Sequence, residues 1–265
     1  MRQWVVGIFS LLVLTGCGGA PATAAPDGAL RLAVEGNYAP FSMVDKKGNL
    51  SGFDVDIANA LCKQLEVKCV LVRRDWATIQ DGILGTKPAL WKDVDAVVAS
   101  VSISDGRRAT TDFTRAYYQV PARFVRRKGT KAEVTDTLAG QAIGVQQHTT
   151  HDKFLTRRFP DARIVRTATL GEAGQALADG KVELLFGDAL ALQSGPLAGK
   201  QGTKLEFTGP NFDDPAWFGQ GAGVAVKKGD AALRDKLEKA LQAIRDSGQY
   251  KDIAARYFRF DIAGR

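Results

Sequence analysis

Short apolar runs alternate with longer segments of helical periodicity over most of the chain. The apolar runs are residues 30–34, 69–72, 95–100, 143–145 and 182–186. The segments with apolar residues at helical spacing are residues 54–65, 152–159, 170–178 and 231–247. Strands that alternate with helices are typical of α/β proteins with parallel sheets. This alternation predicts an α/β fold, and 265 residues suffice for one large domain or two modest ones.

The charge pattern argues against a nucleic-acid partner. The formal net charge is +7, and a basic chain raises that possibility. However, the basic residues are scattered among acidic ones, and no dense Lys/Arg run with interleaved aromatic residues is present. The longest basic stretch, residues 123–128, is interrupted by Phe124 and Val125. We interpret it as a strand or strand edge with solvated charges; the alternative is a nucleic-acid-binding patch.

The N-terminus has the features of an export signal. Arg2 gives a short positive region, and residues 4–14 form an apolar core that is shorter than the roughly 20 residues of a membrane-spanning helix. The core ends in Leu-Thr-Gly-Cys, which resembles the lipobox of bacterial lipoproteins. We therefore predict a signal peptide over residues 1–16, a lipid anchor to a membrane on Cys17, and a flexible tether over residues 17–29. The alternative is an ordinary signal peptide with a chance cysteine.

Cysteine usage agrees with export. Three cysteines are present, and if Cys17 carries lipid, Cys62 and Cys69 remain as a pair. Outside the cytoplasm such a pair is expected to oxidise to a disulfide. A metal site is the alternative, but two cysteines without nearby histidines make a poor zinc set. No metal is therefore expected.

Several further motifs follow one another along the chain. They are Tyr-Ala-Pro-Phe (residues 38–41), Gly-Phe-Asp-Val-Asp-Ile-Ala (52–58), Ser-Val-Ser-Ile-Ser-Asp-Gly-Arg (100–107), Asp-Phe-Thr (112–114) with Tyr117 and Tyr118, Gly-Val-Gln-Gln (144–147) before Thr149, and Asp188. In this order they resemble the family 3 bacterial solute-binding proteins, the amino-acid receptors of ABC importers. The cysteine pair, residues 207–210 with 217–219, and residues 257–260 are similar to the lysine/arginine/ornithine- and histidine-binding branch. The resemblance covers residues 30–264.

The resemblance implies the two-lobe, type II periplasmic-binding-protein fold, in which each lobe is a sheet flanked by helices. Residues 30–119 and 221–265 would form lobe 1, and residues 120–220 would form lobe 2. The ligand would bind in the cleft between the lobes, which close on it by a hinge. The expected protein is an exported monomer that needs no cofactor, with a free amino acid and an ABC importer permease as partners.

The resemblance places a carboxylate-binding group at Arg107, whose guanidinium can hold a carboxylate through two parallel hydrogen bonds. Ser100, Ser102 and backbone N–H groups are expected to add donors. Thr149 and Thr150 precede a predicted helix, whose N-terminus favours an anion. A surface position is the alternative for Arg107, and a helix cap is the alternative or additional role of the threonines.

The other parts of an amino acid need partners as well. The resemblance assigns the ligand ammonium to Asp188, the ligand stem to Tyr38 and Trp76, and a cationic side chain to Glu35. An ordinary turn aspartate and core packing of Trp76 are the alternatives. Glutamine-binding relatives also have an acid at the position of Glu35, so this residue favours a cation only modestly.

Two features depart from the family pattern. His148 stands where the family usually has Gly, and either adds a contact, narrows the cleft or is a surface residue. The connection over residues 84–93 is longer than usual, and its Trp91 either contacts a partner or anchors the loop.

Two rival functions remain at this point. Some relatives of this fold are cyclohexadienyl dehydratases, which use a carboxylate in the cleft as general acid, and Asp188, His148 and His151 would then be the residues to consider. We expect no enzyme, because an Arg107–Asp188 pair suits recognition of an intact amino acid. The third possibility is a module that binds the same ligands for a sensory system.

Overall fold

The computed structural model describes residues 28–263, and these build two five-stranded sheets with helices on their faces. The first sheet has the order β5 (Cys69–Arg73), β1 (Leu30–Val34), β6 (Ala96–Val97), β13 (Ala222–Lys227) and β7 (Thr111–Tyr118). The second has the order β10 (Arg163–Thr167), β9 (Ala142–Gln146), β11 (Leu184–Asp188), β8 (Ala122–Arg127) and β12 (Leu205–Phe212). A small third sheet joins β2 (Asn37–Tyr38), β3 (Ser42–Val44) and β4 (Leu50–Ser51). The predicted two-lobe α/β fold is confirmed.

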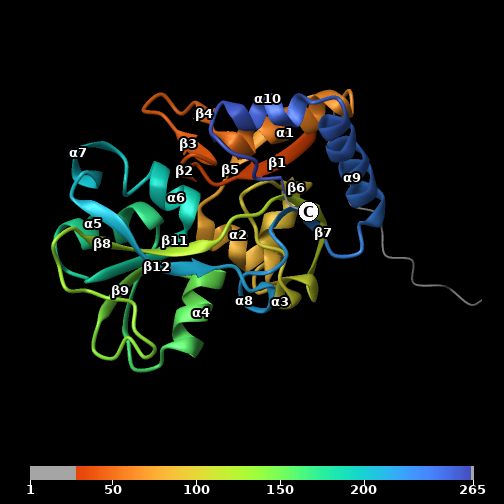
Figure 1. Cartoon of the computed structure of the whole chain (residues 1–265). Coiled ribbons are helices and arrows are strands. Elements are labelled where there is room, and N and C mark those ends of the chain that lie inside the picture. Colours follow the sequence, from red (N-terminus) through yellow and green to blue (C-terminus); the bar gives the residue numbers. More distant parts are fainter. Residues whose placement is uncertain (1–27, 264–265) are drawn as a thin grey trace, which may run out of the picture.

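The helices divide between the two large sheets. The first is packed by α1 (Phe53–Gln64), α9 (Ala231–Asp246) and α10 (Gln249–Ala255), with α2 (Trp76–Ile83), the 3₁₀ helix η1 (Pro88–Lys92) and α3 (Asp105–Arg108) on the same part of the molecule. The second is packed by α4 (Thr150–Arg158), α5 (Leu170–Ala178), α6 (Ala189–Ser194) and α7 (Gly199–Gly202). Figure 1 shows both ends of the described chain, in red-orange and blue, in one lobe and the green-to-cyan middle in the other.

The sheets are mixed, so the expectation of parallel sheets is wrong in part. β1 runs parallel to β5 and β6, and β9 runs parallel to β10 and β11. In contrast, β13 is antiparallel to its two neighbours, and so is β8. The reason is the route of the chain: β8 and β13 each follow a strand of the other sheet. Only a crossover that returns to the same sheet imposes the parallel arrangement.

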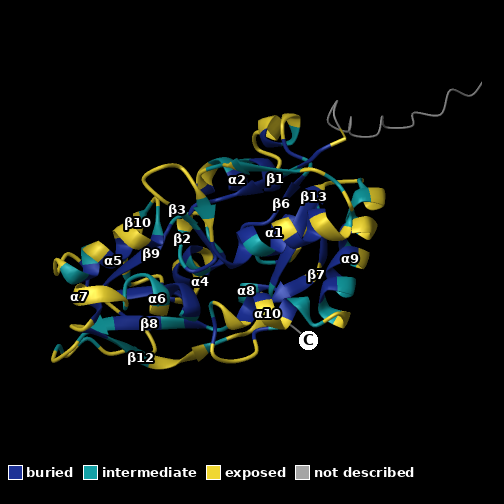
Figure 2. Cartoon of the chain, turned by 90° about the horizontal axis from the view of Figure 1, so that it is seen from above, coloured by how far each residue is buried: buried dark blue, intermediate teal, exposed yellow. Residues whose placement is uncertain are grey.

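Two connections pass between the sheets. Residues 119–121 lead from β7 to β8, and residues 213–221 lead from β12 to β13 through the short α8 (Pro215–Phe218). A β-bridge between Ser102 and Ala222 lies at the second of these connections. Three of the four strands that these connections join, β7, β8 and β13, have buried stretches, which are dark blue in Figure 2, whereas β12 is mostly half-buried or exposed. Each connection therefore has at least one end in a buried strand.

Local hydrogen bonds explain where the elements differ from the predicted bounds. The helix predicted over residues 152–159 begins at Thr150, because the Thr149 hydroxyl accepts a hydrogen bond from the Asp152 N–H at 3.0 Å and caps it. The apolar run of residues 95–100 contributes only β6, because Ser100 has a φ of 53° and leaves the extended conformation. The basic stretch of residues 123–128 is a strand, β8, but it lies between β11 and β12 and not at an edge.

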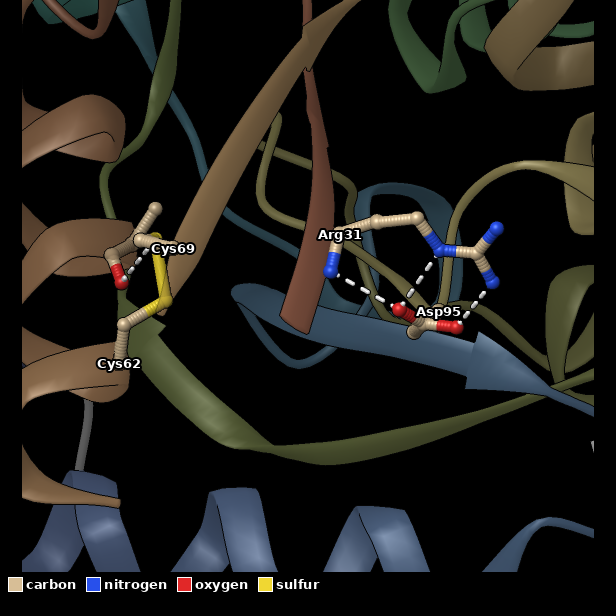
Figure 3. Close-up of a disulfide and its surroundings, with 5 residues drawn as sticks. Arg31, Cys62, Cys69 and Asp95 are labelled. Atoms are coloured by element: carbon tan, nitrogen blue, oxygen red, sulfur yellow. Dashed lines mark hydrogen bonds and ion pairs between the residues drawn. A yellow bond between two sulfur atoms is a disulfide. The ribbon is translucent and has the colours of Figure 1, made fainter. Parts of the chain in front are cut away.

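A disulfide and an ion pair join neighbouring elements of the first lobe (Figure 3). Cys62, near the end of α1, is joined to Cys69, the first residue of β5, with 5.5 Å between their Cα atoms. Arg31 of β1 donates from its Nε and Nη2 to the carboxylate of Asp95 at 3.1 and 2.6 Å. Within residues 28–263, no cluster of three or more His, Cys, Asp or Glu side chains is arranged to hold a metal ion.

The predictions for the N-terminus concern residues that the structure does not describe. The signal peptide over residues 1–16 and the lipid site at Cys17 lie outside the described residues, and so does most of the tether over residues 17–29. Ala29 is already buried and β1 follows it, so the packed lobe begins at the end of that tether. No helix between residues 28 and 263 is long and apolar enough to cross a membrane.

The long connection over residues 84–93 is folded back onto α2. Trp91 donates its indole N–H to the carbonyl of Gly82 at 3.0 Å, and Leu90 is buried against the same glycine. A Cβ atom on Gly82 would lie 2.4 Å from the Cβ of Leu90, so this packing requires glycine. Trp91 thus anchors the loop, which was one of the two possibilities.

Candidate functional site

Two adjoining cavities lie between the lobes, and together they contain every ligand-binding residue predicted from the sequence. Both are lined by Tyr38, Ser100, Ser102, Thr150 and His151. The first extends to Asp188 and to the crossing connections. The second extends to Glu35, Trp76, Arg107, Gln146 and Thr149. The sequence therefore identified residues that are up to 153 positions apart (Glu35 to Asp188) and that the fold brings to one cleft.

Arg107 is a buried cation that has only neutral protein partners. Its side chain lies at the end of α3 and the residue is 4% exposed. Nη1 donates to the carbonyl of Ser102 and Nη2 to the side-chain oxygen of Gln80, both at 2.9 Å. No carboxylate among residues 28–263 forms an ion pair with it. Burial lowers the pKa of Arg107 to about 10, so the guanidinium stays charged at neutral pH and lacks a counter-ion.

The N-terminus of α4 lies on the same cavity as Arg107. The Thr149 hydroxyl is used as the cap, since it accepts from Asp152 and donates to the carbonyl of Gln146 at 2.8 Å. Thr150, the first helical residue, is buried and lines both cavities. The first N–H groups of a helix have no partner within it and favour an anion. Thr149 is thus a cap, while Thr150 presents the helix end to the cleft.

Ser100 differs from its expected role as a donor. Its hydroxyl donates to the buried Asp54 at 2.8 Å, and its N–H donates to the Tyr117 hydroxyl at 3.0 Å. Tyr117 in turn donates to Asp54 at 2.7 Å, so the three residues form a closed network under the cleft. Both protons of Ser100 are therefore committed, and only its acceptor oxygens are left for a ligand. Ser102 has a carbonyl engaged by Arg107 and a half-buried side chain on the cavity.

Asp188 is a buried carboxylate that has no cationic protein partner in the described part of the chain. It ends β11 and caps α6, and its Oδ1 accepts from the N–H groups of Leu190 and Ala191 at 2.9 and 3.0 Å. Burial raises the pKa of Asp188 to about 7, although these two hydrogen bonds act in the opposite direction. The turn-aspartate role and a ligand role are therefore compatible, because only Oδ1 is used by the cap and the residue lines the first cavity.

Glu35 is a second buried carboxylate of the same kind. It is 3% exposed, and its Oε1 accepts a hydrogen bond from Nε2 of Gln146 in the other lobe at 3.3 Å. Burial raises the pKa of Glu35 to about 7, and the Gln146 amide lowers it only in part. No Lys or Arg among the described residues forms an ion pair with Glu35.

Two aromatic side chains of the first lobe complete the walls. Trp76 opens α2, packs in the apolar core and also lines the cavity, so core packing and a cleft position both apply. Its indole N–H donates to the carbonyl of Gln147 across the cleft at 3.1 Å, and its ring lies 5.6 Å from Cζ of Arg107. Tyr38 stacks on Phe41, with 5.6 Å between the ring centroids. Burial, with the nearby Asp188 and Glu35, raises the pKa of Tyr38 well above its usual value.

The two histidines next to the threonines lie in different surroundings. His148 is exposed, has a φ of 61° and is not on either cavity. The left-handed conformation explains why glycine suits this position. His151, which sequence reasoning considered only for catalysis, lines both cavities between the rings of Phe186 and Phe218. Burial, with a smaller effect of Arg107, lowers the pKa of His151 to about 4, so it is neutral. The sequence feature that could have predicted its cleft position is that His151 directly follows Thr150.

The cleft thus combines one uncompensated buried cation with two uncompensated buried carboxylates, between aromatic walls. Buried ionisable groups either lose their charge through a shifted pKa or need counter-ions, and a ligand with charges of the opposite sign would supply such counter-ions here. The fold and this cleft define a two-lobe solute-binding protein. The family model "Bacterial extracellular solute-binding proteins, family 3" matches residues 30–260, and the chain belongs to this family.

Three known proteins show how close the relationship is. The chain is 38% identical to the L-arginine-binding protein of Pseudomonas aeruginosa, over 91% of this chain and 92% of that one. It is 33% identical to the lysine/arginine/ornithine-binding periplasmic protein of Escherichia coli, over the full length of both. Its structure matches a Salmonella typhimurium periplasmic binding protein of high arginine specificity with a TM-score of 0.75 and 27% identity, over 87% and 99% of the two chains.

A further similar structure concerns the enzyme alternative. It is an ancestral amino-acid-binding protein described as a precursor of cyclohexadienyl dehydratase, with a TM-score of 0.73 and 23% identity, over 88% of this chain and 96% of that one. At this identity the likeness shows the fold alone. The relatives in sequence named above are binding proteins.

Proposed function

We propose that this protein is an extracytoplasmic receptor that binds a cationic amino acid and delivers it to an ABC importer. Arginine, lysine and ornithine are the first choices and histidine follows. The observation that carries the proposal is the charge set of the cleft. A cationic amino acid has one carboxylate and two positive groups, which complement the unpaired Arg107 and the unpaired Asp188 and Glu35.

Each group of such a ligand has a proposed partner. The ligand carboxylate binds Arg107 and the N-terminus of α4 at Thr150, with Thr149 holding that helix end. The ligand ammonium binds Asp188, with acceptor oxygens of Ser100 and Ser102 beside it. These assignments are the ones that the family resemblance implies, and they are supported by the position of all these residues on the two adjoining cavities.

The side chain of the ligand is assigned to the second cavity. Its stem lies between Tyr38 and Trp76, and its cationic end pairs with Glu35. Because Glu35 already accepts a hydrogen bond from Gln146, its second oxygen is the one proposed to meet the ligand. A neutral amide in this place would leave the carboxylate without a counter-charge, so a cation is preferred over glutamine.

We further propose that the lobes comprise residues 30–119 with 221–265 and residues 120–220, and that they close on the ligand. The two sheets and the two crossing connections support this division. Two hydrogen bonds cross the cleft, from Trp76 to Gln147 and from Gln146 to Glu35, and both would break on opening. Closure would then bury the ligand between charges of both lobes.

An exported, lipid-anchored monomer is the proposed form in the cell. The short apolar core before Leu-Thr-Gly-Cys supports removal of residues 1–16 and attachment of lipid to Cys17. The periplasmic relatives are consistent with export. Intact-mass spectrometry of the membrane-bound protein is expected to show a lipidated Cys17. A Cys17→Ser variant is expected to be released into solution. Its retention on the membrane would contradict the lipid anchor.

We propose binding and not catalysis as the role of the cleft. The general-acid candidates of a dehydratase are weak here. His148 is exposed and outside the two cavities, and Asp188 is assigned to the ligand ammonium. His151 lines both cavities, but burial lowers its pKa to about 4, so it holds no acidic proton at neutral pH. Incubation with prephenate or arogenate is expected to give no product. Turnover of either compound would favour the enzyme.

Calorimetric titration tests the receptor function. The mature protein without its tether is unfolded and refolded to remove bound ligand, and is then titrated with each common amino acid and ornithine. One-to-one binding of arginine, lysine, ornithine or histidine is expected. Binding of none would refute the receptor, and binding of glutamine in preference would refute the role of Glu35.

A further inference from the structure

We propose that Gln80 is a positioning residue that orients the Arg107 guanidinium for a ligand carboxylate without cancelling its charge. This inference rests on the proposed function. Gln80 lies on α2, is 3% exposed and accepts a hydrogen bond from Nη2 of Arg107 at 2.9 Å. It lies one helical turn after Trp76 on the face of α2 that meets the cleft.

The guanidinium of Arg107 is held from three directions by groups without net charge. The Gln80 amide takes one N–H, the Ser102 carbonyl takes another, and the ring of Trp76 lies 5.6 Å from Cζ. A guanidinium has five N–H groups in one plane, so fixing two of them sets the direction of the others. Preorganisation of this kind favours binding because the side chain need not be ordered when the ligand arrives.

The chemistry of residue 80 matters because of what a carboxylate would do in its place. A glutamate has nearly the same shape, but it would form a buried ion pair with Arg107. The same chain shows such a pair at Arg31, whose guanidinium donates from Nε and Nη2 to the carboxylate of Asp95. An arginine compensated in this way has no reason to attract a ligand carboxylate. The amide therefore provides the acceptor and leaves the charge available.

The second atom of the Gln80 amide supports a role beyond packing. Its Nε2 is buried and has no hydrogen-bond partner among the residues that the structure describes. An unpaired buried donor is unfavourable, and an apolar side chain of similar size would fill the space without it. The side-chain oxygen that faces Arg107 is thus the atom that gives glutamine its advantage here.

Titration calorimetry of two variants with L-arginine and L-lysine tests the inference. Gln80→Glu is expected to lose at least 100-fold in affinity, while its ligand-free melting temperature stays equal to or above that of the unaltered protein. Gln80→Met, which lacks the acceptor, is expected to lose about tenfold. Gln64→Glu places the same charge on an exposed site at the end of α1 and is expected to leave the affinity unchanged, with at most a small decrease in melting temperature from the helix dipole.

The outcomes separate this inference from the proposed function. If the unaltered protein binds neither amino acid, the proposed function fails and this inference fails with it. If it binds but Gln80→Glu stays within threefold of it, only the role of Gln80 is refuted. If Gln80→Glu does not fold, Gln80→Met decides, and affinity within twofold of the unaltered protein would refute the positioning role.

Discussion

Two arginines of the first lobe, Arg31 near the start of β1 and Arg107 in the cleft, have opposite surroundings. Arg31 is paired through two nitrogens with the carboxylate of Asp95, and its own backbone N–H donates to the same carboxylate at 2.8 Å (Figure 3). Arg107 is more deeply buried, yet its partners are a carbonyl, an amide and an aromatic ring. The chain thus supplies a counter-ion to Arg31, whose guanidinium has a structural role, and supplies none to Arg107.

The contrast between these two arginines indicates how a binding site can be recognised from the structure of the chain alone. A buried charge without a counter-ion lowers the stability of the folded chain, and it is retained only if something else benefits. The cleft has three buried ionisable groups without a counter-ion, Arg107, Asp188 and Glu35, whereas Arg31 and Asp95 form a matched pair. Substitutions should therefore affect binding in the first region and stability in the second.

The largest effect is expected from Arg107→Ala. Arg107 is the only Lys or Arg among the described residues that line the two cavities. Its removal leaves the ligand carboxylate buried and unpaired, which typically costs 2–5 kcal/mol, or roughly 30- to 5,000-fold in affinity. Calorimetry with L-arginine and L-lysine measures it. The ligand-free melting temperature is expected to stay the same or rise, because an uncompensated charge is removed.

The matched control is Arg31→Ala. It is expected to keep the affinity and to lower the free energy of unfolding by about 1–3 kcal/mol, because Asp95 loses its partner. Denaturant titration gives this value. Loss of binding in Arg31→Ala with unchanged stability would reverse the comparison and contradict our account of both arginines.

The next largest effect is expected from the carboxylates. Glu35→Gln should weaken binding of arginine and lysine by roughly 10- to 100-fold, because a hydrogen bond to a charged group contributes about 1.5–3 kcal/mol. Binding of glutamine should change much less. Asp188→Asn is the companion variant and should weaken every amino acid alike. If Glu35→Gln weakened all ligands equally, its assignment to the side chain would be wrong.

The disulfide should affect stability alone. Closing the short loop between Cys62 and Cys69 stabilises the folded state by about 2–3 kcal/mol on the chain-entropy model, which corresponds to about 4–12 °C for a chain of this size. Calorimetric melting of the oxidised protein and of a Cys62→Ser, Cys69→Ser variant measures it. An equal melting temperature, with free thiols in the untreated protein, would argue against the disulfide.

A pH dependence of binding is expected as well, and it needs no substitution. Burial raises the pKa of both Glu35 and Asp188 to about 7, so these carboxyls hold protons near neutral pH in the unliganded protein. A cationic ligand favours the ionised forms and lowers both pKa values. Binding should then release protons, and affinity should fall up to tenfold per pH unit for each group below about pH 7.

The same groups affect the stability of the unliganded protein with a defined sign. Because their pKa is higher in the folded chain than in the unfolded one, the stability they contribute is present at low pH and is lost as the pH rises through about 7.

The pH dependence of binding is measured by titration calorimetry between pH 5.5 and 8.5. Use of buffers of different ionisation enthalpy counts the protons released on binding. Affinity independent of pH in this range would show that neither carboxyl meets a cation.

The sequence predicted the fold and nine residues that line the cleft, but it missed His151 and Gln146 and did not show how each residue is used. Motifs in family order were sufficient to assign Arg107, Asp188 and Glu35 to one site, although they are distant in the chain. The sequence could not predict that the Ser100 hydroxyl and N–H donate to Asp54 and Tyr117, because this network joins three distant segments of the chain. The same holds for Gln80, whose acceptor role appears only once Arg107 lies beside it.

Local patterns gave the helices well and the sheet pairing poorly. The helix over residues 170–178 was predicted with the bounds that it has. The antiparallel partners of β8 and β13 were not, because they depend on where the chain crosses between lobes. The spacing of apolar residues within a segment shows which of its faces is buried, but it does not show which strands lie beside it.

One measurement tests the central claim, that the cleft is charged to match a cationic amino acid. The ligand-free protein is titrated with two pairs of similar shape, L-arginine with L-citrulline and L-lysine with L-norleucine. We expect the cation of at least one pair to bind at least 100-fold more tightly than its neutral analogue, and this preference to be largely lost in Glu35→Gln. Equal affinity within both pairs, or no binding of any of the four, would contradict the claim.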